Sequence, residues 1–520
     1  MQESNLTLRP VYHFGPRQNW MNDPNGLCYV DGWYHLFYQY NPSGDQWGSI
    51  HWGHARSSDL IHWEELPVAL SPDHDRGEEH CFSGSLVAMP GERPRIFYTS
   101  IPFGERAVSH RAEQWVAYGS DDLMEWPASD RRKLMDASIH TQSGHMQSDG
   151  SGGGAPEVID WRDPFVFRHD GSGRWAMLLG GTIDGTGAVL VYASPDLENW
   201  SFVRVLYRNQ EQGSFLECPN IGRIGKDHVL LLSNAFRRVE YRIGTLTPDL
   251  RWNDAADDGS RTGILDFGEL EGFYAPQLLH DAHGSLTMIG WASEFSRKAS
   301  TLISGYNGAQ SLPRRLSQHP DGGLAILPHP ALQGLRQEHL KLSCEPGVEY
   351  TALPALDRRF ELNVRASTAV PDGLSIVMYA EVMYAETSEE ADGAGVHGEY
   401  THLYIDSGRD PDSRRRAPGD AELVLDRSHS SADSLMDSSA RRIPLHGNAA
   451  NGNAERSAAR SDASAGGFEL TIFADRSLVE VFINGRSCLT FHVYPISQTA
   501  TGLRIRCAVP LELDMWELRL

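Results

Sequence analysis

The heptapeptide SSDLIHW, at residues 57–63, returns twice along the chain, and this repeat decides the fold. SDDLMEW occupies residues 120–126 and SPDLENW residues 194–200, while a shorter relative, TPDLRW, runs from 247 to 252. In each copy the hydroxyl and carboxylate side chains can bond their own backbone in a turn, and the Leu and Trp supply apolar contacts. A turn that recurs every roughly 50–75 residues indicates a repeat architecture.

Strand-like segments surround these turns, and helical periodicity is scarce before residue 330. Five of the segments are rich in aromatic and branched residues: WYHLFYQY (33–40), RIFYTS (95–100), RWAMLLGG (174–181), AVLVYAS (188–194) and HVLLLSN (228–234). Four-stranded units that repeat in this way are typical of a β-propeller, whose blades surround a central channel. We therefore predict an all-β chain with a five-bladed β-propeller over residues 1–330. A β-sandwich of this length is the structural alternative, but it would not explain the repeated turn.

Four polar motifs precede the repeated tryptophans at similar distances. The separations are 40 residues from Asp23 to Trp63, 43 from Ser83 to Trp126, 37 from Asp163 to Trp200 and 35 from Glu217 to Trp252. Residues at one stage of each blade lie on one ring around the axis of a propeller. Because three of the four are acids, we expect a carboxylate-lined pocket at the mouth of the channel.

The first acid lies in NWMNDPNG, residues 19–26, whose composition is that of a turn between two strands. The ring of acids favours a functional role for it instead. Two carboxylates on either side of a sugar ring can hydrolyse a glycosidic bond, one ionised and one protonated. The amides beside Asp23 suit an ionised group, and the apolar neighbours of Glu217 suit a proton donor. Arg162 is expected to keep Asp163 charged.

Seven motifs together resemble glycoside hydrolase family 32, which contains the β-fructofuranosidases (invertases), fructanases and sucrose-phosphate hydrolases. They are WMNDPNG (20–26), FYQYNP (37–42), QWG (46–48), FSGS (82–85), WRDPF (161–165), ECPN (217–220) and GFYAPQ (272–277). Their number and order make the resemblance specific. FELTIFADRSLVEVFING (468–485) is similar to strands of the family's C-terminal sandwich.

The resemblance implies a five-bladed propeller followed by a β-sandwich, and a retaining double displacement that uses no metal or organic cofactor. Carried over motif by motif, Asp23 is the nucleophile, Glu217 the acid/base and Asp163 the stabiliser of the transition state. The residues implied to bind the fructosyl unit are Asn22, Gln39, Trp47, Phe82, Ser83, Arg162, Tyr274 and Trp291. Amides bond sugar hydroxyls in both directions and indoles supply flat contact area. Trp47 and Trp291 could instead be core aromatics.

The charge and the cysteines limit the partners and the compartment. The net charge of −23 disfavours nucleic acid and anionic membranes and is compatible with a neutral small-molecule substrate. No apolar run approaches the roughly 18 residues that span a membrane, and no secretory signal is recognised at the N-terminus. Six scattered cysteines indicate reduced thiols and a cytoplasmic protein. His51 and His54 lack a third ligand nearby, so no metal site is predicted.

The last third is expected to form a second domain. PHPALQGLRQE (328–338) predicts a short helical linker, placed at 331–340, and residues 341–520 a β-sandwich with strands such as FELNVRA (360–366) and ELTIFA (469–474). Asn484-Gly485 indicates a hairpin. Residues 128–158 are expected to be a loop at the rim of the pocket. Residues 408–466 are expected to be an exposed insertion, apart from possible strands such as AELVLDR.

Hydrolysis of sucrose and short fructo-oligosaccharides is the leading hypothesis. A sucrose-6-phosphate hydrolase and a fructosyltransferase on the same scaffold are alternatives, since the acceptor and any phosphate contact are not visible in the sequence. A catalytically inactive sugar-binding propeller is the alternative of a different class, because a fold alone does not fix function. Monomer and homodimer are both left open.

Overall fold

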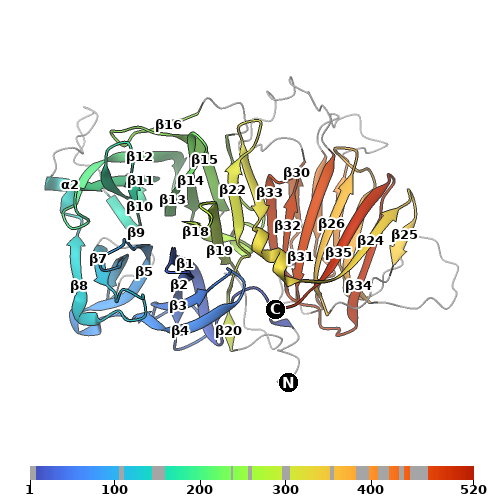
Figure 1. Cartoon of the computed structure of the whole chain (residues 1–520), viewed down its shortest axis with the longest axis horizontal. Coiled ribbons are helices and arrows are strands. Elements are labelled where there is room, and N and C mark those ends of the chain that lie inside the picture. The colour runs from blue at the N-terminus through green and yellow to red at the C-terminus, as the bar shows by residue number, and fades with distance from the viewer. Residues whose placement is uncertain are drawn as a thin grey trace.

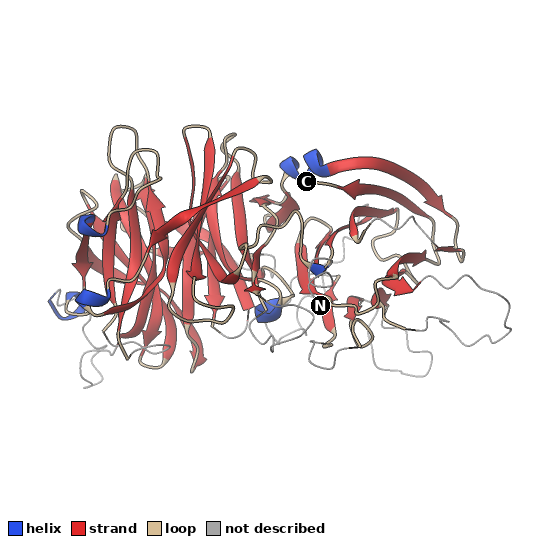
Figure 2. Cartoon of the chain, turned by 90° about the horizontal axis from the view of Figure 1, so that it is seen from below, coloured by secondary structure: helices blue, strands red, loops and turns tan. Residues whose placement is uncertain are grey.

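The computed structural model describes residues 8–104, 111–142, 158–235, 238–255, 261–294, 305–351, 357–381, 398–407, 421–432, 438–445 and 467–520. Strands make up nearly all of its regular structure (Figure 2). The helices of the described chain are single turns or little more: η1 (His74–Arg76), η2 (Ala128–Asp130), α2 (Ile139–Gln142), η3 (Glu269–Glu271) and η4 (Pro330–Leu335). The propeller and the sandwich lie side by side, with the C-terminus near their junction (Figure 1).

The first two thirds of the chain form five antiparallel units, blades I to V. Blade I contains β1 (Asn19–Val30), β2 (Trp33–Asn41), β3 (His51–Ser57) and β4 (Trp63–Leu70), and blade II contains β5 (Glu78–Val87), β6 (Arg95–Pro102), β7 (Glu113–Tyr118) and β8 (Arg131–Met135). Blade III contains β9 (Val158–His169), β10 (Arg174–Ile183), β11 (Thr186–Ser194) and β12 (Ser201–Gln212). Blade IV contains β13 (Leu216–Ile224), β14 (Asp227–Asn234), β15 (Arg238–Leu246), β16 (Trp252–Asp254) and β17 (Thr262–Ile264). Blade V contains β18 (Tyr274–His280), β19 (Leu286–Ala292), β21 (Ala309–Gln310), β22 (Arg314–Gln318) and β23 (Leu324–Pro328).

The innermost strands close into a ring. β1 contacts β5, β5 contacts β9, β9 contacts β13, β13 contacts β18, and β18 returns to contact β1. The short β20 (Tyr306–Asn307) pairs with β1 and ties the end of the propeller to its beginning. The predicted five-bladed propeller is therefore confirmed.

The repeated turn joins the third strand of blades I to IV to the next strand. Its leucine is buried in every copy and has a left-handed backbone, with φ of 71° at Leu60, 64° at Leu123, 68° at Leu197 and 59° at Leu250. In the first three copies the tryptophan indole donates to the carbonyl of that leucine, at 3.0, 2.9 and 3.1 Å. The same side chains thus build the same corner three times, and the fourth copy keeps the buried left-handed leucine while its Trp252 indole donates to Asp254 at 2.8 Å.

Each innermost strand also loses its register with its neighbour beside one of the sequence motifs, and β1, β5 and β9 each have a second break. The breaks beside the motifs fall between Met21 and Pro24, Phe82 and Gly84, Arg162 and Phe165, Glu217 and Asn220, and Tyr274 and Gln277. A β-bulge of this kind bends the strand and redirects side chains. The expectation that NWMNDPNG forms a turn is wrong: the segment lies inside β1, and its Pro and Gly accommodate the bulge.

The last third of the chain forms two six-stranded sheets, which confirms the predicted sandwich. One sheet contains β24 (Arg336–Cys344), β35 (Leu511–Leu518), β26 (Arg359–Ala366), β31 (Phe468–Asp475), β32 (Leu478–Ile483) and β33 (Ser487–His492). The other contains β25 (Glu349–Thr351), β34 (Ala500–Arg506), β27 (Ser375–Glu381), β28 (Thr401–Asp406), β29 (Glu422–Asp426) and β30 (Arg441–Pro444). The hairpin at Asn484-Gly485 is present, with φ of 52° and 62°.

Two regions predicted to be irregular contribute strands. β8 lies within 128–158 and forms the outer edge of blade II, and β29 and β30 lie within 408–466 and extend a sheet of the sandwich. β29 is the possible strand AELVLDR that the sequence indicated, whereas β8 and β30 are edge strands, whose polar residues can face water, so composition alone misjudged those two. Residues 143–157, 408–420, 433–437 and 446–466 lie outside the described residues.

A buried ion network joins the two domains. Arg314 of β22 is fully buried, and its guanidinium lies 2.8 Å from Asp266 Oδ2 and 2.8 Å from Glu480 Oε2 of β32. Thr490 of β33 accepts another of its hydrogen bonds at 2.7 Å. Because buried charges are costly unless they are paired, this network ties the propeller to the sandwich.

Candidate active site

Three acids meet at the bulges of three innermost strands. Asp23 lies in the bulge of β1, Asp163 in that of β9 and Glu217 at that of β13. The Cys218 thiol lies 3.5 Å from Asp23 Oδ2 and 3.5 Å from Asp163 Oδ2, so one sulfur contacts both carboxylates. The structure therefore brings the three predicted acids together around the propeller axis.

Asp23 is held by a set of hydroxyl and amide groups. The Ser83 hydroxyl donates to its Oδ2 at 2.6 Å, and the Asn22 amide donates to its Oδ1 at 3.0 Å. Gln39 donates to the Ser83 hydroxyl and accepts from Asn22 at 3.0 Å. Burial raises the pKa of Asp23, while the bonds from Ser83 and Asn22 lower it. Donors of this kind favour the ionised form.

Glu217 is oriented from its other side. It is 18% exposed, forms an ion pair with Arg162 and accepts a hydrogen bond from the Tyr274 hydroxyl at 2.7 Å. The Arg162 guanidinium lies 4.4 Å above the ring of Phe215 and 5.7 Å from that of Phe82. The rings of Phe215 and Phe82 and the neighbouring carboxylates thus hold Arg162 in place, and Arg162 in turn orients Glu217.

Asp163 differs from the sequence expectation. Arg162 contacts it only at 3.9 Å and pairs more closely with Glu217. Burial raises the pKa of Asp163 to about 7, although Arg162 and the backbone N–H of Cys218, which donates at 3.0 Å, lower it. Desolvation outweighs the single arginine because this cation is shared among neighbouring acids.

The aromatic residues lie at different depths. Trp47 is 37% exposed and its ring lies 5.1 Å from that of His80 and 6.2 Å from that of Phe82. Trp291 is buried, and its ring meets that of Trp20 edge to face at 5.6 Å. The Trp20 indole in turn donates to Asn22 Oδ1 at 2.7 Å. Trp47 is thus open to a ligand, whereas Trp291 supports the wall from behind.

Sequence reasoning missed two residues of this site. Cys218 was interpreted only as one of six scattered, reduced thiols, although it follows Glu217 directly in ECPN. Its φ of 46° turns the thiol between two acids, and no sequence signal shows that geometry. Phe215 stacks on Arg162 two residues before the acid, a spacing that could have drawn attention to it.

Other polar residues with a functional look have structural roles. His54 is buried, its ring stacks on Phe37 at 4.0 Å, and its Nε2 lies 2.9 Å from His35 Nδ1. Among the residues that the structure describes, no three His, Cys, Asp or Glu side chains are grouped to hold a metal ion. Within the same residues, no helix has the length and hydropathy to cross a membrane.

Paired carboxylates beside amides, a hydroxyl and an open indole are the groups that hydrolysis of a glycosidic bond requires. Residues 13–328 match the family model for the glycosyl hydrolases family 32 N-terminal domain, and residues 345–509 match that for the family's C-terminal domain. The chain therefore belongs to glycoside hydrolase family 32. The predicted family and the predicted class, an invertase-type glycoside hydrolase, are confirmed.

Individual relatives agree with this assignment. The sucrose-6-phosphate hydrolase of Escherichia coli is 29% identical over 504 residues, which cover 94% of this chain and 90% of the relative. Beta-fructofuranosidase insoluble isoenzyme 1 of Daucus carota is 34% identical over 358 residues, 64% of this chain and 57% of the relative. The crystal structure of an exo-inulinase from Aspergillus awamori has a TM-score of 0.75 at 24% identity and covers 98% of both chains.

Proposed function

We propose that this chain is a retaining β-fructofuranosidase that removes terminal β-D-fructofuranosyl residues from sucrose and short fructo-oligosaccharides. The observation that supports this most is the meeting of Asp23, Asp163 and Glu217 at the bulges of the innermost strands. The relatives are named as a fructofuranosidase, an inulinase and a sucrose-phosphate hydrolase, and these names support fructosyl as the sugar unit that is removed.

In the first step an Asp23 oxygen attacks the anomeric carbon, and the bond from that carbon to the leaving oxygen breaks. Glu217 gives its proton to the leaving oxygen, so the rest of the sugar departs as an alcohol. Ser83 and Asn22 suit Asp23 to attack, because their hydrogen bonds favour its ionised form.

In the second step the Glu217 carboxylate takes a proton from water, whose oxygen attacks the anomeric carbon and displaces Asp23. Glu217 is partly exposed, which gives water access to it, and Tyr274 and Arg162 hold its position. Asp163 accepts hydrogen bonds from hydroxyls of the fructosyl ring. Donation from those hydroxyls lowers the pKa that burial has raised, so that a negative charge faces the oxocarbenium-like transition state.

A neutral substrate is favoured over sucrose-6-phosphate by the pairing of the cations near the site. Arg162 pairs with Glu217, and Arg76 lies 3.0 Å from Asp73. A phosphate group binds best to arginines that keep donors available.

The test compares kcat/KM for sucrose, sucrose-6-phosphate and 1-kestose, and follows the anomer of the released fructose by NMR. We expect sucrose and 1-kestose to be preferred and the β-anomer to appear first. Release of the α-anomer would overturn the double displacement, and a strong preference for the phosphorylated sugar would overturn the substrate. If most of the fructose appears in longer oligomers at high sucrose, the enzyme is a transferase.

We also propose a reducing, cytoplasmic compartment for this protein. All six cysteines are free, and five of them are buried. Disulfides are rare in reducing compartments. Fractionation of the source cells tests this, and recovery of the protein outside the cytoplasm would contradict it.

A further inference from the structure

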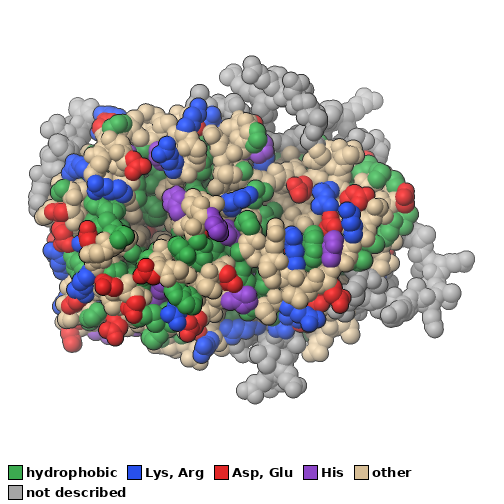
Figure 3. Space-filling model, in the orientation of Figure 1, with side chains coloured by type: hydrophobic (Ala, Val, Ile, Leu, Met, Phe, Trp, Pro, Cys, Tyr) green, Lys and Arg blue, Asp and Glu red, His purple; other side chains and the backbone are tan. Residues whose placement is uncertain are grey.

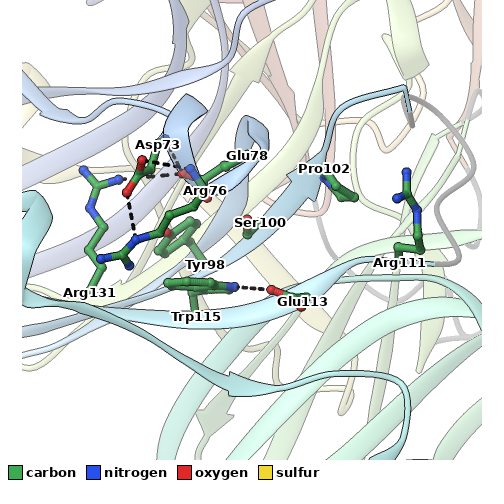
Figure 4. Close-up of a pocket in the computed structure, with 11 residues that line it drawn as sticks. Asp73, Arg76, Glu78, Tyr98, Ser100, Pro102, Arg111, Glu113, Trp115 and Arg131 are labelled. Carbon is green, nitrogen blue, oxygen red and sulfur yellow. Dashed lines mark hydrogen bonds and ion pairs between the residues drawn. The ribbon is translucent and has the colours of Figure 1, made fainter.

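Blade II contains a second polar cavity, separate from the three acids (Figure 4). Its volume is about 190 Å³. One water needs about 10–15 Å³ of such space, so the cavity has room for about a dozen non-hydrogen atoms, the size of a hexose. The lining residues that matter here are Asp73, Arg76, Glu78, Glu113, Trp115 and Arg131.

The cavity shares strand β5 with the active site. Glu78, which lines the cavity, begins β5, and Ser83, which binds Asp23, follows five residues later on the same strand. At about 3.3 Å per residue, Glu78 lies roughly 15 Å along the strand from Ser83. His80 and Phe82, whose rings stack at 5.6 Å, occupy the strand between the two places.

Three acids and three arginines line the cavity, so its formal charges balance: Asp73, Glu78 and Glu113 with Arg76, Arg111 and Arg131. Arg76 lies 3.0 Å from Asp73, and Arg131 lies 3.8 Å from Glu78. The remaining acid, Glu113, accepts from the Trp115 indole at 2.9 Å and from Lys133 at 3.1 Å. A site without excess charge suits a neutral ligand better than a phosphate or a carboxylate.

Two buried atoms of the cavity lack hydrogen-bond partners among the described residues, Oε1 of Glu78 and Nε of Arg131. Both residues are more than nine-tenths buried, and an unpaired buried polar atom is costly. One is an acceptor and the other a donor, which is the combination that a sugar hydroxyl satisfies. Arg76 extends over the Trp115 ring, with 5.7 Å from its guanidinium carbon to the ring centre (Figure 4). Phe103, which follows the lining residue Pro102 in the sequence, is 50% exposed.

We propose that this cavity binds one unit of a neutral sugar. The unit is either the far end of a fructo-oligosaccharide whose other end lies at Asp23, or a separate saccharide molecule. The proposal relies on the proposed function only for the first of these sources. The cavity, its paired charges and its unpaired atoms do not depend on the reaction.

The test uses Arg76→Ala with Arg93→Ala as a matched control. Both arginines belong to the segments of blade II, are about half exposed (47% and 51%), pair with one aspartate and lie over one aromatic ring. Arg93 does not line the cavity. Calorimetric titration with sucrose and with an inulin-type oligosaccharide is performed on Asp23→Ala protein, with and without each substitution, and turnover is measured with Asp23 intact.

If the far end of the substrate binds here, Arg76→Ala lowers kcat/KM for the oligosaccharide by about tenfold, the effect of losing one hydrogen bond from a charged donor, and leaves sucrose turnover unchanged. If a separate sugar binds, titration shows two equivalents of sucrose, and Arg76→Ala removes one. Equal behaviour of the Arg76 and Arg93 variants in both measurements overturns the proposal. A wild type that turns over no fructoside refutes the proposed function instead, and the titration still tests the cavity.

Discussion

Replacing Ser83 with alanine tests how the site keeps its nucleophile ionised. The hydroxyl donates to Asp23 Oδ2 at 2.6 Å and, with Asn22 and Cys218, is one of three groups whose hydrogen bonds lower the pKa of Asp23 against burial. A hydrogen bond to a charged group is worth about 1.5–3 kcal/mol, so we expect kcat/KM for sucrose to fall by about 10- to 150-fold. Loss of this donor also raises the pKa of Asp23, because the hydrogen bond favours the ionised carboxylate.

The sign of the pH effect follows from the role of Asp23. The carboxylate must be ionised to attack, so activity rises as the pH increases through its pKa, and a raised pKa moves the acidic limb of the kcat/KM profile to higher pH. The assay is the initial rate of glucose release from sucrose between pH 3 and pH 9. An acidic limb that stays in place, or moves to lower pH, would refute the reasoning.

Ser85→Ala is the matched control. Ser85 lies two residues further along β5, is similarly buried, donates to the Pro164 carbonyl at 2.7 Å and accepts from the Val166 N–H at 2.9 Å. Its loss is expected to lower the free energy of unfolding by about 1 kcal/mol. The acidic limb should not move, because Ser85 has no bond to Asp23.

Three further predictions concern other parts of the molecule. Burial raises the pKa of Asp163 from an ordinary 3.8 to about 7, so the folded state binds this proton more tightly than the unfolded state and loses stability as the pH rises from 3.8 to 7. Asp163→Asn should therefore raise the free energy of unfolding above pH 7, by up to roughly 4 kcal/mol, and leave it unchanged below pH 4. Denaturant titration at the two pH values measures this difference. Arg314→Met leaves Asp266 and Glu480 buried without their cation and should cost about 3–5 kcal/mol in the same assay; a loss below 1 kcal/mol would contradict the network. Trp47→Ala should raise KM for sucrose by about tenfold at an unchanged Tm, because its ring is partly exposed; an unchanged KM would exclude contact with substrate.

The fold was largely predictable because its signal is periodic. The repeated turn uses a small set of local bonds, so Ser, Asp, Leu and Trp specify it in the first three copies without help from distant residues. The strands read from aromatic and branched residues were also found. β29 was anticipated as the possible strand AELVLDR, whereas β8 and β30 were missed because edge strands share the polar composition of loops.

The site was predictable in its membership and less so in its electrostatics. Spacing from the tryptophans placed Asp23, Asp163 and Glu217 at one stage of the blades, and the bulges bring them together. The pairing of Arg162 with Glu217 in preference to Asp163 depends on how two bulged strands face each other. Adjacency in sequence does not determine this, and neither does it reveal that Cys218 contacts two acids.

The central claim is that Asp23 and Glu217 carry out the reaction. The most direct measurement is sugar release from sucrose by the wild type, by Asp23→Ala and by Glu217→Ala, with Asp184→Ala, at a half-exposed aspartate of blade III, as the control. We predict that the wild type and the control release glucose and fructose, and that the other two variants lose about a thousandfold or more. Activity retained by either variant, or a wild type inert on sucrose, sucrose-6-phosphate and inulin, would contradict the account.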